Sequence, residues 1–554
     1  MADLAFLWHM HQPDYRHPDS GEFLLPWVLL HAIKDYTDMA AHLEGHPGIR
    51  CTVNFVPVLL DQIEDYTAQF AGSRWRDPLL RIAAAPDACA LPVADREWLL
   101  DMAFRCHAPT MLEPFAPYRR LREMLSHVRS ADGQSLSYLS AAYYADLATW
   151  CLLAWSGESL RRTGRMVPLL MAKGGNFTPA EREALLAELG EAVAGLIPRY
   201  RALADRGQIE LSCTPACHPL APLLLDLGCA REALPDCELP ATREYPGGRT
   251  RVAEHLRIAR DSHQRRFGQT PAGLWPAEGA LSALFLEQIA AAGFQWTASG
   301  HGVLRHSAGD AAATTTPWLP PEGAPGDILL FFRDERLSDL IGFEYAKWHG
   351  RDAARHFLGE LQGTHQRDPD SLIPVFLDGE NAWEYYPYNA WYFFGDLYDA
   401  LEQTPEIRTV TLSEAAQRHR ARSQRLPRLT AGSWVYGTLS TWIGHPDKNR
   451  AWELLCEIKQ CADRALQSGR IDADTARQVS RRLAVCESSD WFWWLGEGNL
   501  PESVATFERL FRCNLRSLYR LLGLPVPASV EHPISTGGET ATGGAMRRAT
   551  ENRP

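Results

Sequence analysis

Seven short apolar segments, separated by stretches long enough to hold helices, constrain the fold of this 554-residue chain more than any other feature. Each segment is bounded by turn residues and is apolar on both faces, which is typical of strands buried in a parallel sheet. Repeated strand and helix units of this kind favour a barrel over an open sheet. The segments are residues 4–8, 50–55, 209–213, 273–275, 294–297, 328–332 and 373–377.

The rest of the chain predicts two helical regions. The stretch from about residue 60 to 205 contains long helical patterns and therefore predicts a helical insertion in the barrel. Its clearest helices are expected at 137–156 and 179–203. After a last extended piece at 409–412, three amphipathic helices predict a bundle packed on the barrel; they are residues 448–468, 473–487 and 501–522.

These patterns divide the chain into three parts. We expect a barrel unit at residues 1–425, including the insertion, and a helical bundle at residues 426–524. Residues 525–554 are mainly Gly, Thr, Ser, Glu and Arg with almost no large apolar side chains. Such a segment cannot offset its ordering entropy by burial, so we expect a disordered tail.

Composition limits the partners. Lys and Arg total 56 against 68 Asp and Glu, and the net charge of -12 gives no positive field to attract nucleic acid. The apolar run at residues 4–8 is too short for a signal peptide or a membrane span. Most of the 12 Cys lie in apolar or helical stretches, which indicates a reducing compartment and no disulfide framework. We expect a cytoplasmic protein of unpredicted oligomeric state.

Two carboxylates are the main candidates for chemistry. Glu278 and Asp378 each follow an apolar segment directly. The carboxyl ends of barrel strands share one cavity, and two carboxyl groups in unlike surroundings can act as an ionised nucleophile and a proton donor. Glycosidic bond cleavage needs this division. Either residue alone would equally fit a helix cap or an ion pair. Four aromatic residues lie close by in sequence and could stack on sugar rings: Trp275, Trp383, Tyr385 and Tyr386.

Two histidines near the N-terminus leave a second chemistry open. His9 and His11 are two residues apart on an extended segment, so both can face the same side. Together with His218 or Asp378 they could hold a zinc ion with an open position, as in a zinc-dependent carbohydrate hydrolase or deacetylase. Either histidine could instead bond to a neighbouring backbone group.

An aromatic cluster at residues 488–494 surrounds Asp490 in the predicted bundle. Its three Trp and one Phe exceed what one helix face can bury, so we expect part of the cluster to reach the cleft. A buried interface between the two domains is the alternative. Trp434 in the preceding loop could join the same surface.

Taken together, these stretches resemble glycoside hydrolase family 57, a family of retaining α-glucan-active enzymes, from residue 4 to about residue 522. The resemblance rests on five motifs: His11-Gln12-Pro13, residues 207–219, residues 275–282, residues 378–383, and Asp490 within residues 489–494. It implies an α/β fold, an incomplete (β/α)7 barrel with a C-terminal α-helical bundle. This agrees with the seven apolar segments.

The resemblance also implies roles. Glu278 would be the nucleophile and Asp378 the general acid/base of a double displacement that requires no metal or other cofactor. The remaining predicted substrate-binding residues are His9, His11, His218, Trp275, Glu380, Trp383, Asp490, Trp491 and Trp494.

The motifs are more similar to those of amylopullulanases and α-amylases in the family than to those of its transferases. We therefore expect hydrolysis of α-1,4 linkages, with α-1,6 linkages as a further option, in an α-glucan or maltooligosaccharide. Two departures from that subgroup, Ala277 and residues 495–499, affect subsite contacts. Transfer by a 4-α-glucanotransferase or branching reaction remains an alternative, because it uses the same intermediate. Binding of a glucan without catalysis is a third.

Overall fold

The computed structural model describes residues 1–131, 135–324, 327–538 and 545–547. Its centre is one sheet with the strand order β10-β6-β7-β5-β4-β3-β2-β1-β8, in which β9 pairs with β1. All of these pairings are parallel except that of β6 with β7. The strands are β1 (Ala2–Met10), β2 (Cys51–Phe55), β3 (Ile209–Cys213), β4 (Gly273–Leu274), β5 (Trp296–Ser299), β6 (Trp318–Leu319), β7 (Leu329–Phe332), β8 (Leu372–Asp378), β9 (Ile407–Thr409) and β10 (Gln424–Arg425).

The sheet confirms the predicted incomplete barrel. The seven apolar segments correspond to β1, β2, β3, β4, β5, β7 and β8. No described strand pairing joins β7 to β8. Loop groups cross this gap instead, since Asp334 N–H donates to the Pro374 carbonyl at 2.7 Å. The central strand β1 is buried throughout, and its register sets His9 beside Asn54 of β2 and Asp378 of β8.

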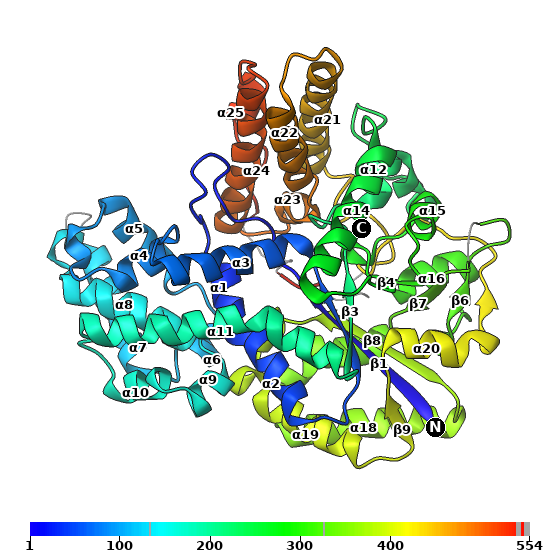
Figure 1. Cartoon of the computed structure of the whole chain (residues 1–554), viewed down its shortest axis with the longest axis horizontal. Coiled ribbons are helices and arrows are strands. Elements are labelled where there is room, and N and C mark those ends of the chain that lie inside the picture. The colour runs from blue at the N-terminus through cyan, green and yellow to red at the C-terminus, as the bar shows by residue number, and fades with distance from the viewer. Residues whose placement is uncertain (132–134, 325–326, 539–544, 548–554) are drawn as a thin grey trace.

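The insertion between β2 and β3 is helical, as predicted, and extends to one side of the barrel in Figure 1. The helix expected at 179–203 is α11, which begins with a capping box formed by Thr178 and Glu181. The helix expected at 137–156 starts later because Ser140 caps it. The insertion comprises α3 (Pro57–Gly72), α4 (Pro78–Ala84), α5 (Val93–Met102), α6 (Ala108–Met111), α7 (Ala116–Ala131), α8 (Ala141–Ala154), α9 (Glu158–Thr163), α10 (Met166–Lys173) and α11 (Pro179–Asp205).

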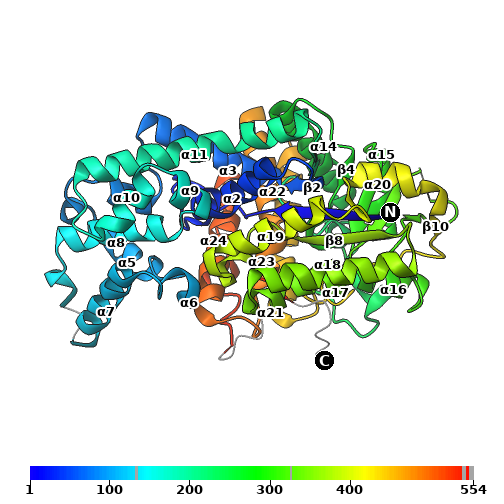
Figure 2. The same ribbon diagram turned by 90° about the horizontal axis from the view of Figure 1, so that it is seen from below.

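Further helices cover the sheet, and Figure 2 shows them on both sides of it. Two aromatic residues of β1 pack against these helices: Trp8 contacts Phe394 of α19, and Phe6 contacts Phe357 of α18. These helices are α1 (Trp27–His31), α2 (Thr37–Gly45), α12 (Ala221–Leu225), α13 (Ala230–Ala233), α14 (Gly248–Phe267), α15 (Ala283–Ala291), α16 (His301–Ala308), α17 (Glu335–Asp339), α18 (Gly350–Arg367), α19 (Trp391–Glu402) and α20 (Leu412–His419).

The C-terminal bundle stands on the barrel at the top of Figure 1. A buried ion pair connects the bundle to the barrel. Nε of Arg251 in α14 lies 2.7 Å from Oε1 of Glu487, and Nε2 of His255 lies 2.7 Å from Oε2 of the same residue. The charges of Arg251 and His255 hold the pKa of Glu487 below its usual range despite its burial. The bundle comprises α21 (Pro446–Gln467), α22 (Ala473–Cys486), α23 (Ser489–Trp494) and α24 (Pro501–Leu521).

Two expectations differ from the structure. The extended piece expected at 409–412 is extended only at its start, because Thr411 caps α20 and Leu412 begins that helix. Part of the expected disordered tail is structured: it forms α25 (Ala528–Glu531), and Ile534 N–H donates to Glu508 Oε1 at 2.8 Å. Val530 is fully buried and Ile534 packs against the core, so this segment buries apolar side chains in addition to its polar contact with α24. Residues 539–544 and 548–554 of the tail lie outside the described residues.

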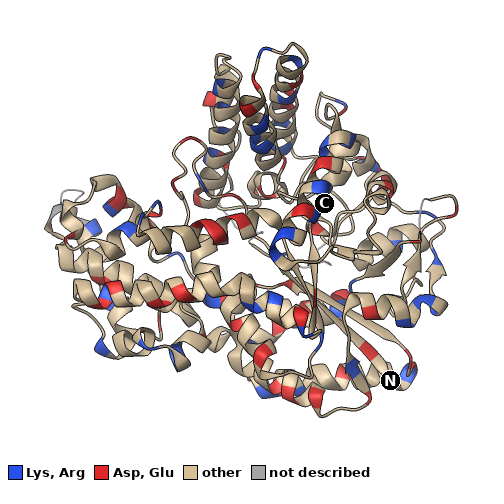
Figure 3. Ribbon diagram, in the orientation of Figure 1, with Lys and Arg blue, Asp and Glu red and all other residues tan. Residues whose placement is uncertain are grey.

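Surface charges of both signs are interspersed along the same helices in Figure 3. Lys459 and Asp463 on α21, for example, form an ion pair one turn apart. Among the described residues, we find no helix that combines the length and apolarity needed to span a bilayer.

Candidate active site

A cavity of about 590 Å³ opens at the carboxyl ends of the barrel strands, beneath the bundle. Strand β1 leads into it through His9 and His11, and β8 through Asp378. The bundle contributes Asp490 and Trp494 from α23. Glu278 follows β4 and lines the same cavity. The two predicted carboxylates and the predicted bundle residue therefore share one space.

Glu278 is held in an unusual backbone conformation. It lies in the short helix η5 (Ala277–Gly279) with φ of 58°, in the left-handed region that a glutamate rarely adopts. His218, which follows β3, also has φ of 58° and lies 4.0 Å from Glu278. Such strain persists only where the surrounding structure fixes it, and it is concentrated at functional sites.

Two donors orient the Glu278 carboxyl group. Its Oε2 accepts a hydrogen bond from Nε1 of Trp434 at 3.1 Å, and its Oε1 accepts one from Oγ of Ser489 at 3.1 Å. Burial and then the charges of Asp490 and Asp378 raise the pKa of Glu278, the two donors lower it, and the net result is a pKa of about 8. The proton affinity of Glu278 is thus set by groups from both domains.

Asp378 is the last residue of β8 and has different partners. Its Oδ2 accepts a hydrogen bond from Nδ2 of Asn381 at 2.9 Å. Burial raises the pKa of Asp378, while Asn381 and the charges of His11 and Arg333 act in the opposite direction. A buried carboxyl group with a raised pKa is suited to hold a proton that it later donates.

Glu380 lies two residues further on and is also buried. Its Oε1 accepts the backbone N–H of His11 at 3.1 Å. Burial, followed by the charge of Asp378, holds the pKa of Glu380 well above its usual range. Its other oxygen is buried without a hydrogen-bond partner among the described residues, and Glu380 itself lines the cavity. Glu380 is therefore placed to position His11 and to bind a ligand hydroxyl.

Three histidines form a stack beside these carboxylates. His9 Nε2 lies 3.1 Å from His218 Nε2, and His9 Nδ1 lies 2.7 Å from Oδ1 of Asn54. The ring of His11 stacks on that of His218 with centroids 3.7 Å apart. Burial, followed by the charge of His11, lowers the pKa of His9 to about 3 and that of His218 well below its usual value. His9 and His218 are therefore neutral at neutral pH.

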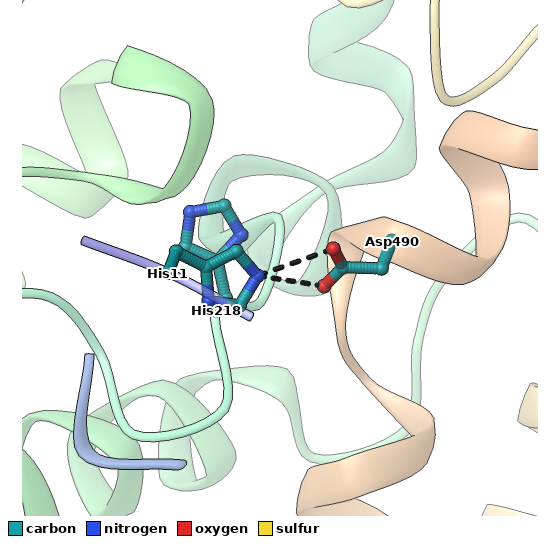
Figure 4. A group of neighbouring side chains, drawn as sticks. All are labelled: His11, His218 and Asp490. Atoms are coloured by element: carbon teal, nitrogen blue, oxygen red, sulfur yellow. Dashed lines mark hydrogen bonds and ion pairs between the residues drawn. The ribbon is translucent and has the colours of Figure 1, made fainter. Parts of the chain in front are cut away.

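Asp490 reaches this stack from the bundle (Figure 4). His11 Nε2 lies 3.1 Å and 2.9 Å from its two carboxylate oxygens, and Ser488 donates to Oδ2 at 2.5 Å. His11, His218 and Asp490 each offer a ligand atom within 4.8 Å of the others. An imidazole binds zinc in the plane of its ring, at ~2.0 Å from the nitrogen. The nearly parallel rings of His11 and His218, stacked at 3.7 Å, cannot both direct a nitrogen at one ion. The pair His11 and His218 therefore does not fit one zinc ion in this geometry, and the zinc alternative with His9, His11 and Asp378 stays a prediction.

The predicted tryptophans differ in position. Trp275, Trp383 and Trp491 are buried and do not line the cavity. Trp275 packs edge-on against Trp434, at 5.2 Å between ring centroids, and so supports the residue that binds Glu278. Trp494 does line the cavity and stacks on Phe507 at 4.6 Å. Of the predicted tryptophans, only Trp494 is placed to stack on a sugar ring.

Other aromatic and polar side chains complete the cavity wall. Tyr385, predicted to stack on sugar rings, and Trp434, predicted to join the surface of the aromatic cluster, both line the cavity. The wall formed by the insertion and by α1 was not predicted, because no motif marks its residues. Arg333, which follows β7, stacks over Trp434 at 5.5 Å. The wall residues without a prediction include Trp27, His31, His107, Trp155 and Arg333.

Buried carboxyl groups, hydrogen-bond donors and aromatic rings around one cavity at barrel strand ends are the combination that glycoside-cleaving enzymes use. Residues 5–427 match the model of glycosyl hydrolase family 57. The chain belongs to this family.

Solved structures of three enzymes have a similar fold. A branching enzyme from Thermococcus kodakaraensis matches with a TM-score of 0.59 over 94% of this chain and 90% of its own, at 15% identity. An α-amylase from Thermotoga maritima matches with a TM-score of 0.55 over 96% and 95%, at 14% identity. A 4-α-glucanotransferase from Thermococcus litoralis matches with a TM-score of 0.51 over 94% and 60%, at 14% identity. These similarities support the fold and leave the particular reaction open.

Proposed function

We propose that the protein is a retaining enzyme that cleaves α-glucans by double displacement. The observation that carries this proposal is the presence of Glu278 and Asp378 in one cavity, both buried but with different hydrogen-bond partners. The structurally similar enzymes are named as a branching enzyme, an α-amylase and a 4-α-glucanotransferase, all of which act on α-glucans. A cytoplasmic location stays a prediction from the sequence.

In the first step, Asp378 donates its proton to the glycosidic oxygen while a carboxylate oxygen of Glu278 attacks the anomeric carbon. The bond from that carbon to the leaving sugar breaks, and a covalent glycosyl ester forms on Glu278. In the second step, Asp378 accepts a proton from water or from a sugar hydroxyl, which attacks the same carbon and releases Glu278.

The two carboxyl groups influence each other's protonation. The reactive form needs one proton on the pair, with Asp378 neutral and Glu278 ionised. Because the charge of Asp378 is one cause of the high pKa of Glu278, protonation of Asp378 favours ionisation of Glu278. The donors Trp434 and Ser489 then stabilise the ionised carboxylate.

Hydrolysis of the α-amylase or amylopullulanase type is the outcome we propose, following the motif resemblance. Transfer to a second glucan is the other candidate, and the aromatic wall of the cavity favours it. Beyond Glu278 the wall continues through Trp27, Trp155 and Tyr385, which offers aromatic surface for an acceptor sugar. The balance between water and acceptor then depends on how well bound sugars exclude water.

The test is to incubate the purified protein with pullulan, amylose and maltooligosaccharides and to resolve the products by size and linkage. Shorter products from amylose and pullulan support the proposed hydrolase. Longer or newly branched products identify a transferase. The Glu278→Gln variant is the control, and it should produce neither set. Absence of any wild-type product would reject the proposed function.

A further inference from the structure

Three exposed tyrosines follow strand β8, the first at the cavity and the other two outside it. Tyr385, Tyr388 and Tyr392 have 41%, 56% and 50% of their surface exposed. They lie in η8 (Trp383–Tyr385), η9 (Pro387–Ala390) and the first turn of α19. Tyr385 also lines the cavity and packs against His107 at 4.8 Å between ring centroids. The row therefore begins at the active site and leads away from it.

The backbone that carries Tyr388 is strained. Tyr388, Asn389 and Ala390 have φ of 55°, 51° and 59°, three consecutive non-glycine residues in the left-handed region. Residues with a Cβ atom rarely adopt this conformation, because the Cβ atom comes too close to the backbone. The turn is held by Asn389, whose Oδ1 accepts from Nζ of Lys34 and whose Nδ2 donates to Oδ2 of Asp38, both at 3.0 Å. This anchoring fixes the turn that presents Tyr388 to solvent.

Tyr392 is held in place as well. Its ring meets that of Tyr388 edge-on, with centroids 5.3 Å apart. The guanidinium of Arg162 in α9 lies 5.2 Å from the ring of Tyr392 and donates to its hydroxyl at 3.1 Å. Figure 2 shows α9 beside the start of α19, in agreement with this contact. Both exposed rings are thus ordered before any ligand binds, so binding loses little side-chain entropy.

We infer that Tyr385, Tyr388 and Tyr392 form an aromatic track that binds glucose units of a polymeric α-glucan outside the cavity. Ordered, exposed aromatic rings with phenolic hydroxyls suit the apolar ring faces and the hydroxyls of an uncharged sugar. Continuity with the cavity at Tyr385 selects the same polymer that the active site cleaves. This inference rests on the proposed function.

The track predicts a difference between long and short substrates. A maltooligosaccharide that fills only the cavity does not reach Tyr388 and Tyr392, whereas glycogen or amylopectin does. The double variant Tyr388→Ala/Tyr392→Ala should weaken binding of amylopectin about tenfold. Turnover of maltotriose should stay within about twofold of wild type. Because the ligand is uncharged, added salt should leave the binding of amylopectin unchanged.

The experiment measures retardation of the full-length protein in native gels that contain amylopectin, together with kcat/KM on maltotriose. Tyr138→Ala is the matched control, since Tyr138 is 87% exposed and lies in the insertion at η3 (Ser135–Tyr138). Tyr388→Phe/Tyr392→Phe keeps the rings and should retain most of the binding. Circular dichroism checks that each variant folds.

Selective loss of amylopectin binding in the alanine double variant, with wild-type behaviour of Tyr138→Ala, supports the track. Unchanged amylopectin binding overturns it, and so does a parallel loss of maltotriose turnover, which would indicate disruption of the active site. If the wild-type protein cleaves maltotriose but does not bind amylopectin, the track fails and the proposed function stands. If it neither binds nor cleaves any α-glucan, both fail.

Discussion

Ser489 of the bundle donates a hydrogen bond to Glu278 of the barrel, although 211 positions separate them in the sequence. The same hydroxyl lies 2.8 Å from Nδ1 of His218. A hydroxyl has one hydrogen, so it cannot donate to both partners at once. When Ser489 donates to Glu278, it stabilises the ionised carboxylate. The bundle thereby acts on the proton affinity of the proposed nucleophile.

Removal of that hydroxyl should shift the pH dependence toward higher pH. The hydrogen bond from Ser489 lowers the pKa of Glu278, so Ser489→Ala raises it, and a higher pH is then needed to ionise the nucleophile. We expect kcat/KM at neutral pH to fall about tenfold or more. Initial rates on maltotriose across the pH range measure the shift. Ser489→Thr keeps the hydroxyl and is the control; an unmoved acidic limb in the alanine variant contradicts the prediction.

Replacement of the charge on Asp490 should have the opposite effect. The charge of Asp490 follows burial as the largest cause of the raised pKa of Glu278. Asp490→Asn removes it, so the pKa of Glu278 falls and the acidic limb of kcat/KM moves to lower pH. Initial rates on maltotriose across the pH range measure this shift as well. A shift to higher pH would mean that Asp490 acts mainly by positioning His11.

Glu278 should also make the folded state less stable at high pH. Its pKa in the folded protein, about 8, lies above the ordinary value of 4.5. Its favourable contribution is therefore present below pH 4.5 and is lost as the pH rises to about 8. Glu278→Gln stays neutral, so its stability relative to wild type should rise over this range by a few kcal/mol, at ~1.4 kcal/mol per pKa unit.

Urea unfolding at about pH 5 and about pH 9 measures this difference. The exposed Glu183→Gln serves as the control for loss of a carboxylate, and its difference from wild type should not change with pH. An equal stability difference for Glu278→Gln at both pH values would contradict a raised pKa in the folded protein.

Strand positions could be predicted because a buried strand leaves a local pattern. The run predicted at 209–213 coincides with β3, and the others differ from their strands by only a few residues. Turn residues and apolar runs are sufficient for this because a parallel sheet is buried on both faces. The family membership and the incomplete barrel are confirmed, whereas the catalytic roles of Glu278 and Asp378 remain predictions.

Side-chain directions and long-range contacts could not be predicted in the same way. Trp491 and Trp494 lie in the same short helix, yet the first is buried against Phe511 and the second lines the cavity. The sequence shows both as tryptophans and does not indicate which face the barrel covers. The left-handed conformation of Glu278 has no sequence signal either, and the residues that contact its carboxyl group, Trp434 and Ser489, lie 156 and 211 positions away.

Metal removal should leave activity unchanged. The rings of His11 and His218 are stacked, so they cannot share an ion, and the proposed double displacement uses carboxylates alone. We expect wild-type rates on maltotriose after extended dialysis against EDTA, and no increase when zinc is added. A loss of activity that zinc restores would support the zinc-dependent hydrolase instead.

Replacement of the proposed acid should depend on the leaving group. Asp378→Asn cannot protonate the glycosidic oxygen, so cleavage of maltotriose should fall by ~10²–10⁴-fold. An aryl α-glycoside with a good leaving group needs little proton donation, and its first step should fall much less. The measurement is kcat/KM on both substrates, with the burst of released phenol reporting the first step.

Asn381→Ala, which removes only the hydrogen bond to Asp378, is the control and should have a smaller effect on both substrates. Equal losses on the two substrates in Asp378→Asn would contradict the acid role, because a residue that only shapes the cavity affects them alike.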